Sequence, residues 1–134
     1  MIFVDASALV AIIAEEPGSD ALVDILEIRE KVFTTPVAIF EAVLAITRIM
    51  NIEPEDAYTL VVEMLSATEI AVESIPVAAA AIAVGAHARF GKGRHPAQLN
   101  FGDCLSYASA NLAGASILFV GNDFNHTDLQ SALP

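Results

Sequence analysis

Four short, almost wholly apolar segments alternate along this chain with longer segments of helical character, and this alternation limits the possible folds more than any other feature. The apolar segments cover residues 2–4, 32–34, 70–72 and 117–120. Runs this short and apolar are typical of strands covered on both faces, and strands separated by helices form parallel sheets. The sequence therefore predicts an α/β fold with three layers, in which a short, mainly parallel sheet is flanked by helices.

The segments between these strands carry helix signals. Pro36 suits the first turn of a helix, and Gly91 suits the position just after the end of one. A length of 134 residues fits one domain spanning residues 1–134, because ordinary domains have about 100–150 residues. Helices are expected over residues 7–15, 19–30, 36–50, 53–66, 77–90 and 100–113.

The composition excludes several classes of protein. A hydrophobic content of 55% is too high for a disordered chain. The longest uncharged run, residues 104–122, is long enough to span a bilayer, but its serines, asparagine and central glycine favour a buried helix followed by a strand. The N-terminus lacks the basic start of a signal peptide, and one cysteine cannot form an internal disulfide. We expect a cytoplasmic protein without membrane contact.

Four acidic residues occupy apolar or uncharged surroundings. Asp5 directly follows the first apolar segment, Glu41 lies in the least charged stretch of its helix, and Asp103 begins another mostly uncharged helix. Asp123 lies three residues beyond the last apolar segment. An ionised carboxylate in an apolar interior is costly unless it is paired or binds a cation, and the chain has 6 Lys and Arg against 17 Asp and Glu. Oxygen ligands without a His or Cys cluster favour Mg²⁺ or Mn²⁺.

Each acid also has a structural interpretation. Asp103 lies three residues after Asn100, which is the spacing of a helix cap. Asp123 could be a turn residue, and Glu41 could reach solvent or pair with Arg48. Asp5 is the hardest of the four to explain by a structural role, because it directly follows a strand and has apolar neighbours on both sides. Four such acids together carry more information than any one of them.

Carboxylate-bound Mg²⁺ is typical of enzymes that act on phosphate esters, because it activates water and stabilises an in-line displacement at phosphorus. The chain contains no Gly-rich phosphate loop of the GxxxxGK[ST] kind, which disfavours a nucleotide triphosphatase. Phosphodiester hydrolysis fits these observations best. The net charge of -11 has the wrong sign for gripping nucleic acid by bulk electrostatics, so any such substrate must be held locally.

Two motifs and one further acid stand out together: DASAL at residues 5–9, FGKGRHPAQLNFGDC at residues 90–104, and Glu41 between them. Together they resemble the PIN-domain family, and within it the VapC ribonuclease toxins of bacterial toxin–antitoxin pairs. The resemblance covers essentially the whole chain and implies a PIN-like fold. It also implies that Asp5, Glu41 and Asp103 form an acidic triad for Mg²⁺, in which Glu41 binds the metal or orients water.

A fourth acid follows the last main strand in that family, often as the first Asp of a TxDxDF pattern. This chain has FVGNDF at residues 119–124, with Gly121 in the first Asp position. The resemblance suggests Asp123 as the substitute, with Asn122 as a residue that could share its role. Ser7 matches a supporting hydroxyl of the family, although it could equally cap a helix.

The resemblance further implies RNA cleavage, a cognate VapB-type antitoxin and a homodimer. Arg89, Lys92 and Arg94 supply half of the chain's Lys and Arg within one short segment that leads into the helix of Asp103. This segment is either a phosphate-positioning loop for RNA or simply a basic helix end followed by a solvated loop.

Two other functions remain open at this point. A phospho-acceptor domain would phosphorylate Asp5, but such a domain needs a suitably placed lysine, and the chain has only Lys31 and Lys92. A non-catalytic binding module would keep the fold for partner contacts alone. Apolar helix positions such as Leu22, Ile25 and Leu26 would then form a groove, although core packing explains them as well.

Overall fold

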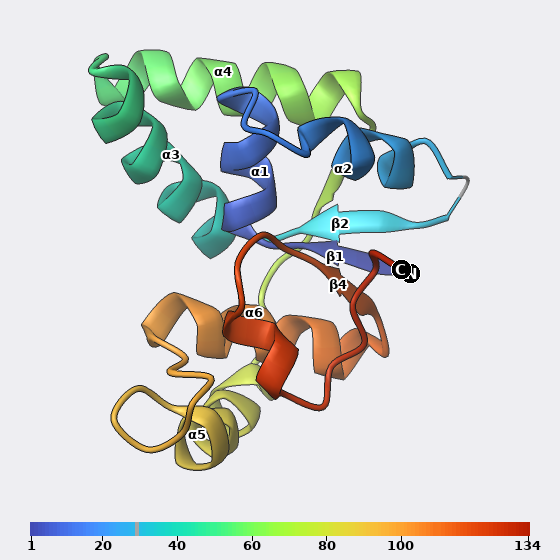
Figure 1. Cartoon of the computed structure of the whole chain (residues 1–134), viewed down its shortest axis with the longest axis vertical. Helices are drawn as coiled ribbons and strands as arrows, with labels where there is room; N and C mark the ends of the chain where they lie inside the picture. Colours follow the sequence, from blue (N-terminus) through green and yellow to red (C-terminus); the bar gives the residue numbers. More distant parts are fainter. Residues whose placement is uncertain (29) are drawn as a thin grey trace.

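The computed structural model describes residues 1–28 and 30–134. Figure 1 shows a central sheet between two layers of helices. In chain order the elements are β1 (Ile2–Val4), α1 (Ala6–Ile13), α2 (Ser19–Leu26), β2 (Val32–Thr34), α3 (Pro36–Met50), α4 (Pro54–Ala67), β3 (Ala71–Val72), α5 (Ala79–Phe90), α6 (Phe101–Ala113), β4 (Ser116–Leu118) and the 3₁₀ turn η1 (Asp123–His126).

The strands form a parallel sheet in the order β3-β2-β1-β4. Helices α1 to α4 cover one face, and α5 and α6 cover the other (Figure 1). This arrangement confirms the predicted three-layer α/β fold. The chain runs outward from β1 to β3 and then returns to the opposite side of β1 as β4, so the direction of winding reverses beside β1.

Alternation along β1 divides the interior into two cores. Ile2 and Val4 face the core under α1 to α4, whereas Phe3 faces the core under α5 and α6. Successive side chains of a strand point to opposite faces, so the three residues of the central strand serve both layers. Phe3 meets Phe33 of β2 edge to face, with 5.4 Å between the ring centroids. The wholly apolar character of the strands therefore follows from burial on both sides.

Several predicted boundaries shift by one or two residues, and the structure differs more from the sequence predictions in two segments. Helix α2 ends at Leu26, not near residue 30, because the chain must turn before Val32 enters the sheet. Arg29, which lay within the predicted helix, is outside the described residues. The turn η1 was not predicted, and it places Asp123 at its start. No helix in residues 1–28 and 30–134 has the length and apolar character needed to cross a bilayer.

The role of Phe3 gives a stability prediction. Phe3 is fully buried in the central strand, so Phe3→Ala leaves a cavity and should lower the free energy of unfolding by about 3–5 kcal/mol. Val77 is 97% exposed, and Val77→Ala should change the free energy of unfolding by less than about 0.5 kcal/mol. Urea unfolding measures both values. Equal effects of the two substitutions would contradict the position of Phe3 in the core.

Candidate active site

The carboxyl ends of β1 and β4 meet where the winding of the sheet reverses. In open parallel sheets this is the position where ligands bind, because the loops on either side diverge and leave a crevice. The backbone N–H of Asp5 donates to the carbonyl of Leu118 at 3.0 Å, so the residue after β1 is fixed against the end of β4. The predicted acids gather around this point.

Asp5 is held by the start of helix α1. It is the N-cap residue, and its Oδ2 accepts hydrogen bonds from the backbone N–H of Ser7 at 3.1 Å and from the Ser7 hydroxyl at 2.6 Å. The Ser7 Oγ in turn accepts the N–H of Val120 at 3.0 Å. Ser7 is therefore not the cap of the helix. It links the carboxylate after β1 to the loop after β4, and it fixes the orientation of a carboxylate that is only 5% exposed.

Asp103 is held by a capping box at the start of helix α6. The Asn100 Oδ1 accepts the N–H of Asp103 at 2.9 Å, and the Asp103 Oδ2 accepts the N–H of Asn100 at 3.1 Å. The structural interpretation of this pair is thus correct. It does not exclude a functional one, because a carboxylate has more acceptor positions than this one hydrogen bond uses. The capping box fixes Asp103 at the wall of the crevice.

Glu41 reaches the same crevice from helix α3. This helix begins directly after β2, with Thr35 as its N-cap and Pro36 in its first turn. The carboxylate of Glu41 packs against the backbone of Gly102 in α6, at the place where any larger residue would carry its Cβ. Gly102 therefore permits the close approach of α3 and α6, and this approach brings Glu41 towards Asp103.

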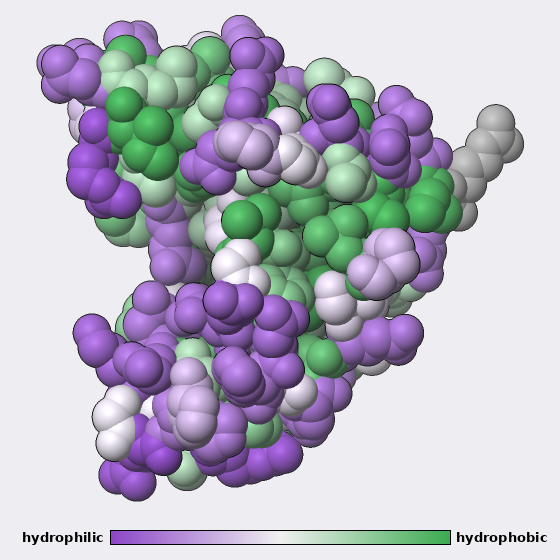
Figure 2. All heavy atoms as spheres, viewed as in Figure 1, coloured by the Kyte–Doolittle hydropathy of each residue, from purple (hydrophilic) through white to green (hydrophobic). Residues whose placement is uncertain are grey.

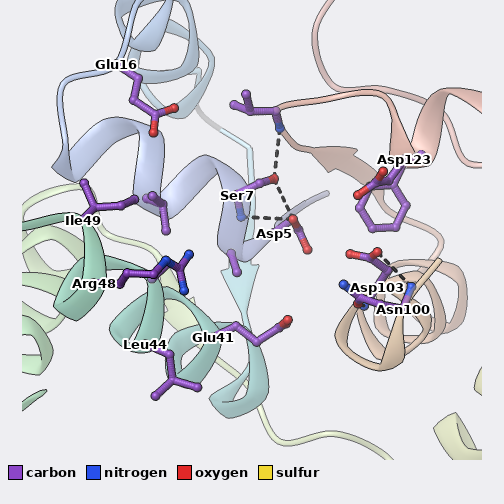
Figure 3. A pocket seen from close by; sticks show the side chains of 15 residues that line it. Asp5, Ser7, Glu16, Glu41, Leu44, Arg48, Ile49, Asn100, Asp103 and Asp123 are labelled. Carbon is purple, nitrogen blue, oxygen red and sulfur yellow. Dashed lines mark hydrogen bonds between the residues drawn. The ribbon is translucent and has the colours of Figure 1, made fainter. Parts of the chain in front are cut away.

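The crevice has a volume of about 530 Å³, and it is lined by Asp5, Glu41, Asp103, Asp123 and residues of α1 and α3. Figure 3 shows the four carboxylates directed into this common space from three sides. In the space-filling view, the outline of the molecule is notched between its two helical layers (Figure 2). The structure thus brings together four acids that are far apart in the sequence.

These carboxylates oppose one another's ionisation. Burial, followed by the charges of Asp5 and Asp103, raises the pKa of Glu41 from 4.5 to about 7. Burial also raises the pKa of Asp103 from 3.8 to about 6; the hydrogen bond from Asn100 opposes this rise, and the charges of Asp5 and Asp123 add to it. Within residues 1–28 and 30–134, none of the four acids forms an ion pair. Near neutral pH these carboxylates therefore repel one another without an ion-pair partner among the described residues, although Arg48 also lines the crevice.

The donor set fits a hard divalent cation in its chemistry. All four groups are carboxylates, and magnesium and related cations prefer oxygen ligands. As the side chains stand, no three Asp, Glu, His or Cys groups of the described residues lie close enough to hold one ion together. Asp5 and Asp103 are tied down by hydrogen bonds, whereas Glu41 has no hydrogen bond from its carboxylate among the described residues. Closure on an ion thus requires side-chain rotation, and neither Glu41 nor the exposed Asp123 is held by a hydrogen bond to its carboxylate among the described residues.

The segment after β4 places Asp123 and Asn122 differently. Asp123 lines the crevice and raises the pKa of Asp103. Asn122 does not line it, and its Oδ1 accepts a hydrogen bond from Asn125 at 3.2 Å. Both residues line a neighbouring hollow of about 330 Å³, which also includes Lys92. The fourth acid therefore stands at the boundary between the two hollows.

The three cations of the predicted basic loop have different surroundings. Lys92 lies beside the acidic crevice, in the hollow that also contains Asp103 and Asp123. Arg89 is directed elsewhere: it pairs with Asp128 at 3.5 Å and lies over the ring of Phe90. Arg94 is exposed and lines none of the hollows described here. Of the three predicted cations, Lys92 is thus the one that lies beside the acids.

Three charged or polar residues of the site were not identified as functional from the sequence: Arg48, Asn100 and Glu16, of which Glu16 lies after α1. Arg48 lines the acidic crevice on α3, where it follows Glu41 by seven residues, or about two helical turns. That spacing was a usable signal, because it places both side chains on one face of the helix. Asn100 lines both hollows in addition to capping α6, and its position gave no such signal.

Comparison of the sequence with known proteins gives consistent results. Residues 2–129 match the PIN domain. A VapC ribonuclease of Rhizobium meliloti is 38% identical, over 96% of this chain and 99% of that protein. Ribonuclease VapC42 of Mycobacterium tuberculosis is also 38% identical, over 96% of this chain and 97% of that protein.

Comparison of the structure with solved structures agrees with the sequence comparison. The crystal structure of VapC20 from Mycobacterium tuberculosis, described as a sarcin-ricin loop cleaving toxin, superposes with a TM-score of 0.78. It covers 100% of both chains at 18% sequence identity. The shared fold is thus retained where most of the sequence differs.

The raised pKa of Glu41 predicts a pH-dependent gain in stability from Glu41→Gln. Stability conferred by the protonated carboxyl is fully present below its ordinary pKa of 4.5 and is lost as the pH rises through about 7. In metal-free buffer near pH 8, Glu41→Gln should therefore raise the Tm by a few degrees, and near pH 4 the gain should vanish. Glu63→Gln removes the same charge from an exposed position of α4 and is the control. A gain that does not depend on pH would contradict the burial of Glu41.

The contact between Gly102 and Glu41 predicts the effect of Gly102→Ala. The added methyl would displace the Glu41 carboxylate, while alanine suits the helical backbone better than glycine. The variant should fold with undiminished stability but bind Mn²⁺ about 10- to 100-fold more weakly in calorimetric titration. Gly85→Ala on α5 is the matched control, because nothing lies within 4 Å of its added methyl. Unchanged Mn²⁺ binding by Gly102→Ala would show that Glu41 does not contribute to the cation site.

Proposed function

The chain belongs to the PIN-domain family, with VapC ribonucleases among its relatives, and we propose that it is an endoribonuclease toxin that hydrolyses RNA in the crevice of Asp5, Glu41, Asp103 and Asp123. The observation that carries this proposal is the convergence, at the switch point of the sheet, of four carboxylates that form no ion pair among the described residues. Such a cluster is destabilising by itself near neutral pH, so a site of this kind favours a divalent cation.

We assign the cation as Mg²⁺, with Mn²⁺ as an alternative. Asp5 and Asp103 would hold it, because both are buried and oriented by hydrogen bonds. A bound ion of this kind supplies a water of lowered pKa and neutralises charge on the scissile phosphate. Glu41 either joins the ligands or orients the attacking water, and Asp123 completes the acidic wall. Hydrolysis then needs no nucleophilic side chain from the protein.

Other residues support these acids. Ser7 holds the Asp5 carboxylate against the loop after β4. Lys92 contacts substrate phosphate beside Asp103 and Asp123. Arg48 lies in the crevice with no ion pair among the described residues, so it is available to a phosphate on the α3 side.

The proposed function also implies a domain organisation, a partner, an oligomeric state and a cellular location. Residues 1–134 form one domain, since both cores share the same sheet. The toxin is neutralised by a VapB-type antitoxin, and a basic antitoxin segment would be attracted by the net charge of -11. The active form is a homodimer in the cytoplasm, where its RNA substrate is present.

A phospho-acceptor role for Asp5 fits these surroundings less well. Lys31 pairs with Glu73 at 2.6 Å, away from the crevice, and the residues lining the crevice include no lysine.

Cleavage of RNA by the protein freed of any partner tests the proposal. Wild-type protein should cut structured RNA with Mg²⁺ or Mn²⁺, and EDTA should abolish cutting. Asp5→Asn should lower the rate at least about 100-fold, because it removes a charged ligand from the buried centre of the site. Asp56→Asn removes an exposed acid from α4 and should have no such effect.

Each other outcome has a definite meaning. Cleavage that survives EDTA or Asp5→Asn would contradict a metal mechanism at this site. No cleavage of any RNA by wild-type protein in either metal would favour the non-catalytic binding module.

A further inference from the structure

An apolar hollow lies beside the acidic crevice, between helices α5 and α6. It has a volume of about 570 Å³, and carbon atoms form nearly all of its lining. Leu99 and the buried Cys104 line it, and Val84 and Phe101 stand at 70% and 81% exposure. A phenylalanine this exposed, two residues before Asp103, is not explained by packing.

The apolar hollow shares lining residues with the acidic site. Asn100 lines the apolar hollow, the acidic crevice and the smaller hollow that contains Lys92. Lys92 lines the apolar hollow and also the smaller one, which contains Asp103 and Asp123. One lysine thus borders both the apolar lining and the acids, and its ammonium is a group that binds phosphate.

The polar groups at the rim suit a nucleotide. The ammonium of Lys92 attracts phosphate, and the imidazole of His87 stands on the same rim. Asn100 uses its Oδ1 in the capping box, and its side-chain NH₂ has no hydrogen-bond partner among the described residues. Figure 3 shows this side chain at the edge of the crevice beside Asp103. An apolar surface of a protein partner would leave these donors unused, whereas RNA supplies acceptors for them.

We propose that this hollow binds a nucleobase next to the scissile phosphate, with the base stacked on Phe101 and its phosphate on Lys92. The inference rests on the proposed ribonuclease function and names a subsite for its substrate. Aromatic stacking is sequence-tolerant and needs an exposed ring, and Phe101 provides one beside the acids. The subsite therefore selects unpaired RNA, because a base in a helix cannot leave its stack to enter the hollow without an energetic cost.

Binding by a non-cleaving protein tests this separately from catalysis. The probe is a set of short, single-stranded RNAs carrying a fluorescent base analogue, titrated with Asp5→Asn protein. Stacking should quench the analogue, and adding Phe101→Ala should remove the quenching and weaken binding roughly 5- to 100-fold. Phe101→Tyr should restore both. Val77→Ala, which removes exposed apolar surface away from the hollow, should change neither.

A kinetic comparison in the otherwise wild-type protein completes the test. Phe101→Ala should raise KM for unpaired RNA more than it lowers kcat, since the ring binds the substrate away from the reacting atoms. Circular dichroism checks the fold, which an exposed side chain should not disturb.

The outcomes separate the two proposals. If wild-type protein cleaves RNA while Phe101→Ala keeps its affinity and quenching, the subsite is wrong and the proposed function stands. If wild-type protein neither cleaves nor binds RNA, both are wrong. If Phe101→Ala instead halves the molecular mass in sedimentation without changing RNA binding by the subunits, the hollow holds a second copy of the chain and the subsite is overturned.

Discussion

The repulsion among buried carboxylates is the constraint on which the rest of this structure depends. Asp5, Glu41 and Asp103 share one crevice, and burial together with mutual repulsion raises the pKa of the latter two. A folded chain can tolerate such a cluster only if the surrounding elements are held in place by other interactions. Here the two hydrophobic cores on either side of the sheet supply that support, so the apolar strands and the acidic site belong to one arrangement.

Local structure positions each acid by a different device. Asp5 caps α1 and is fixed by Ser7, whereas Asp103 is held in a capping box with Asn100. Glu41 depends on the contact between two helices at Gly102. Capping and function are therefore not alternatives at these positions. Hydrogen bonds that begin a helix also fix the direction of the carboxylate that faces the crevice.

The limits of sequence-based prediction follow from the range of the interactions involved. Strands and most helices were predictable, because local patterns such as Pro36 after a strand encode them. The winding of the sheet explains why acids after separate strands meet, so their convergence was expected as well. The packing of Glu41 on Gly102 and the apolar hollow that Lys92 and Phe101 line depend on how distant helices approach one another. No local pattern contains that information, and the turn at Asp123 also depends on the end of β4.

The central claim is that the acidic crevice is a cation site built for phosphodiester hydrolysis. The most direct measurement is anomalous X-ray diffraction from crystals of the protein soaked with Mn²⁺. The account predicts an anomalous peak between the carboxylates of Asp5 and Asp103, at ligand distance from both, with Glu41 rotated towards it. Absence of a peak there at saturating Mn²⁺, or a peak confined to other acids of the chain, would contradict it.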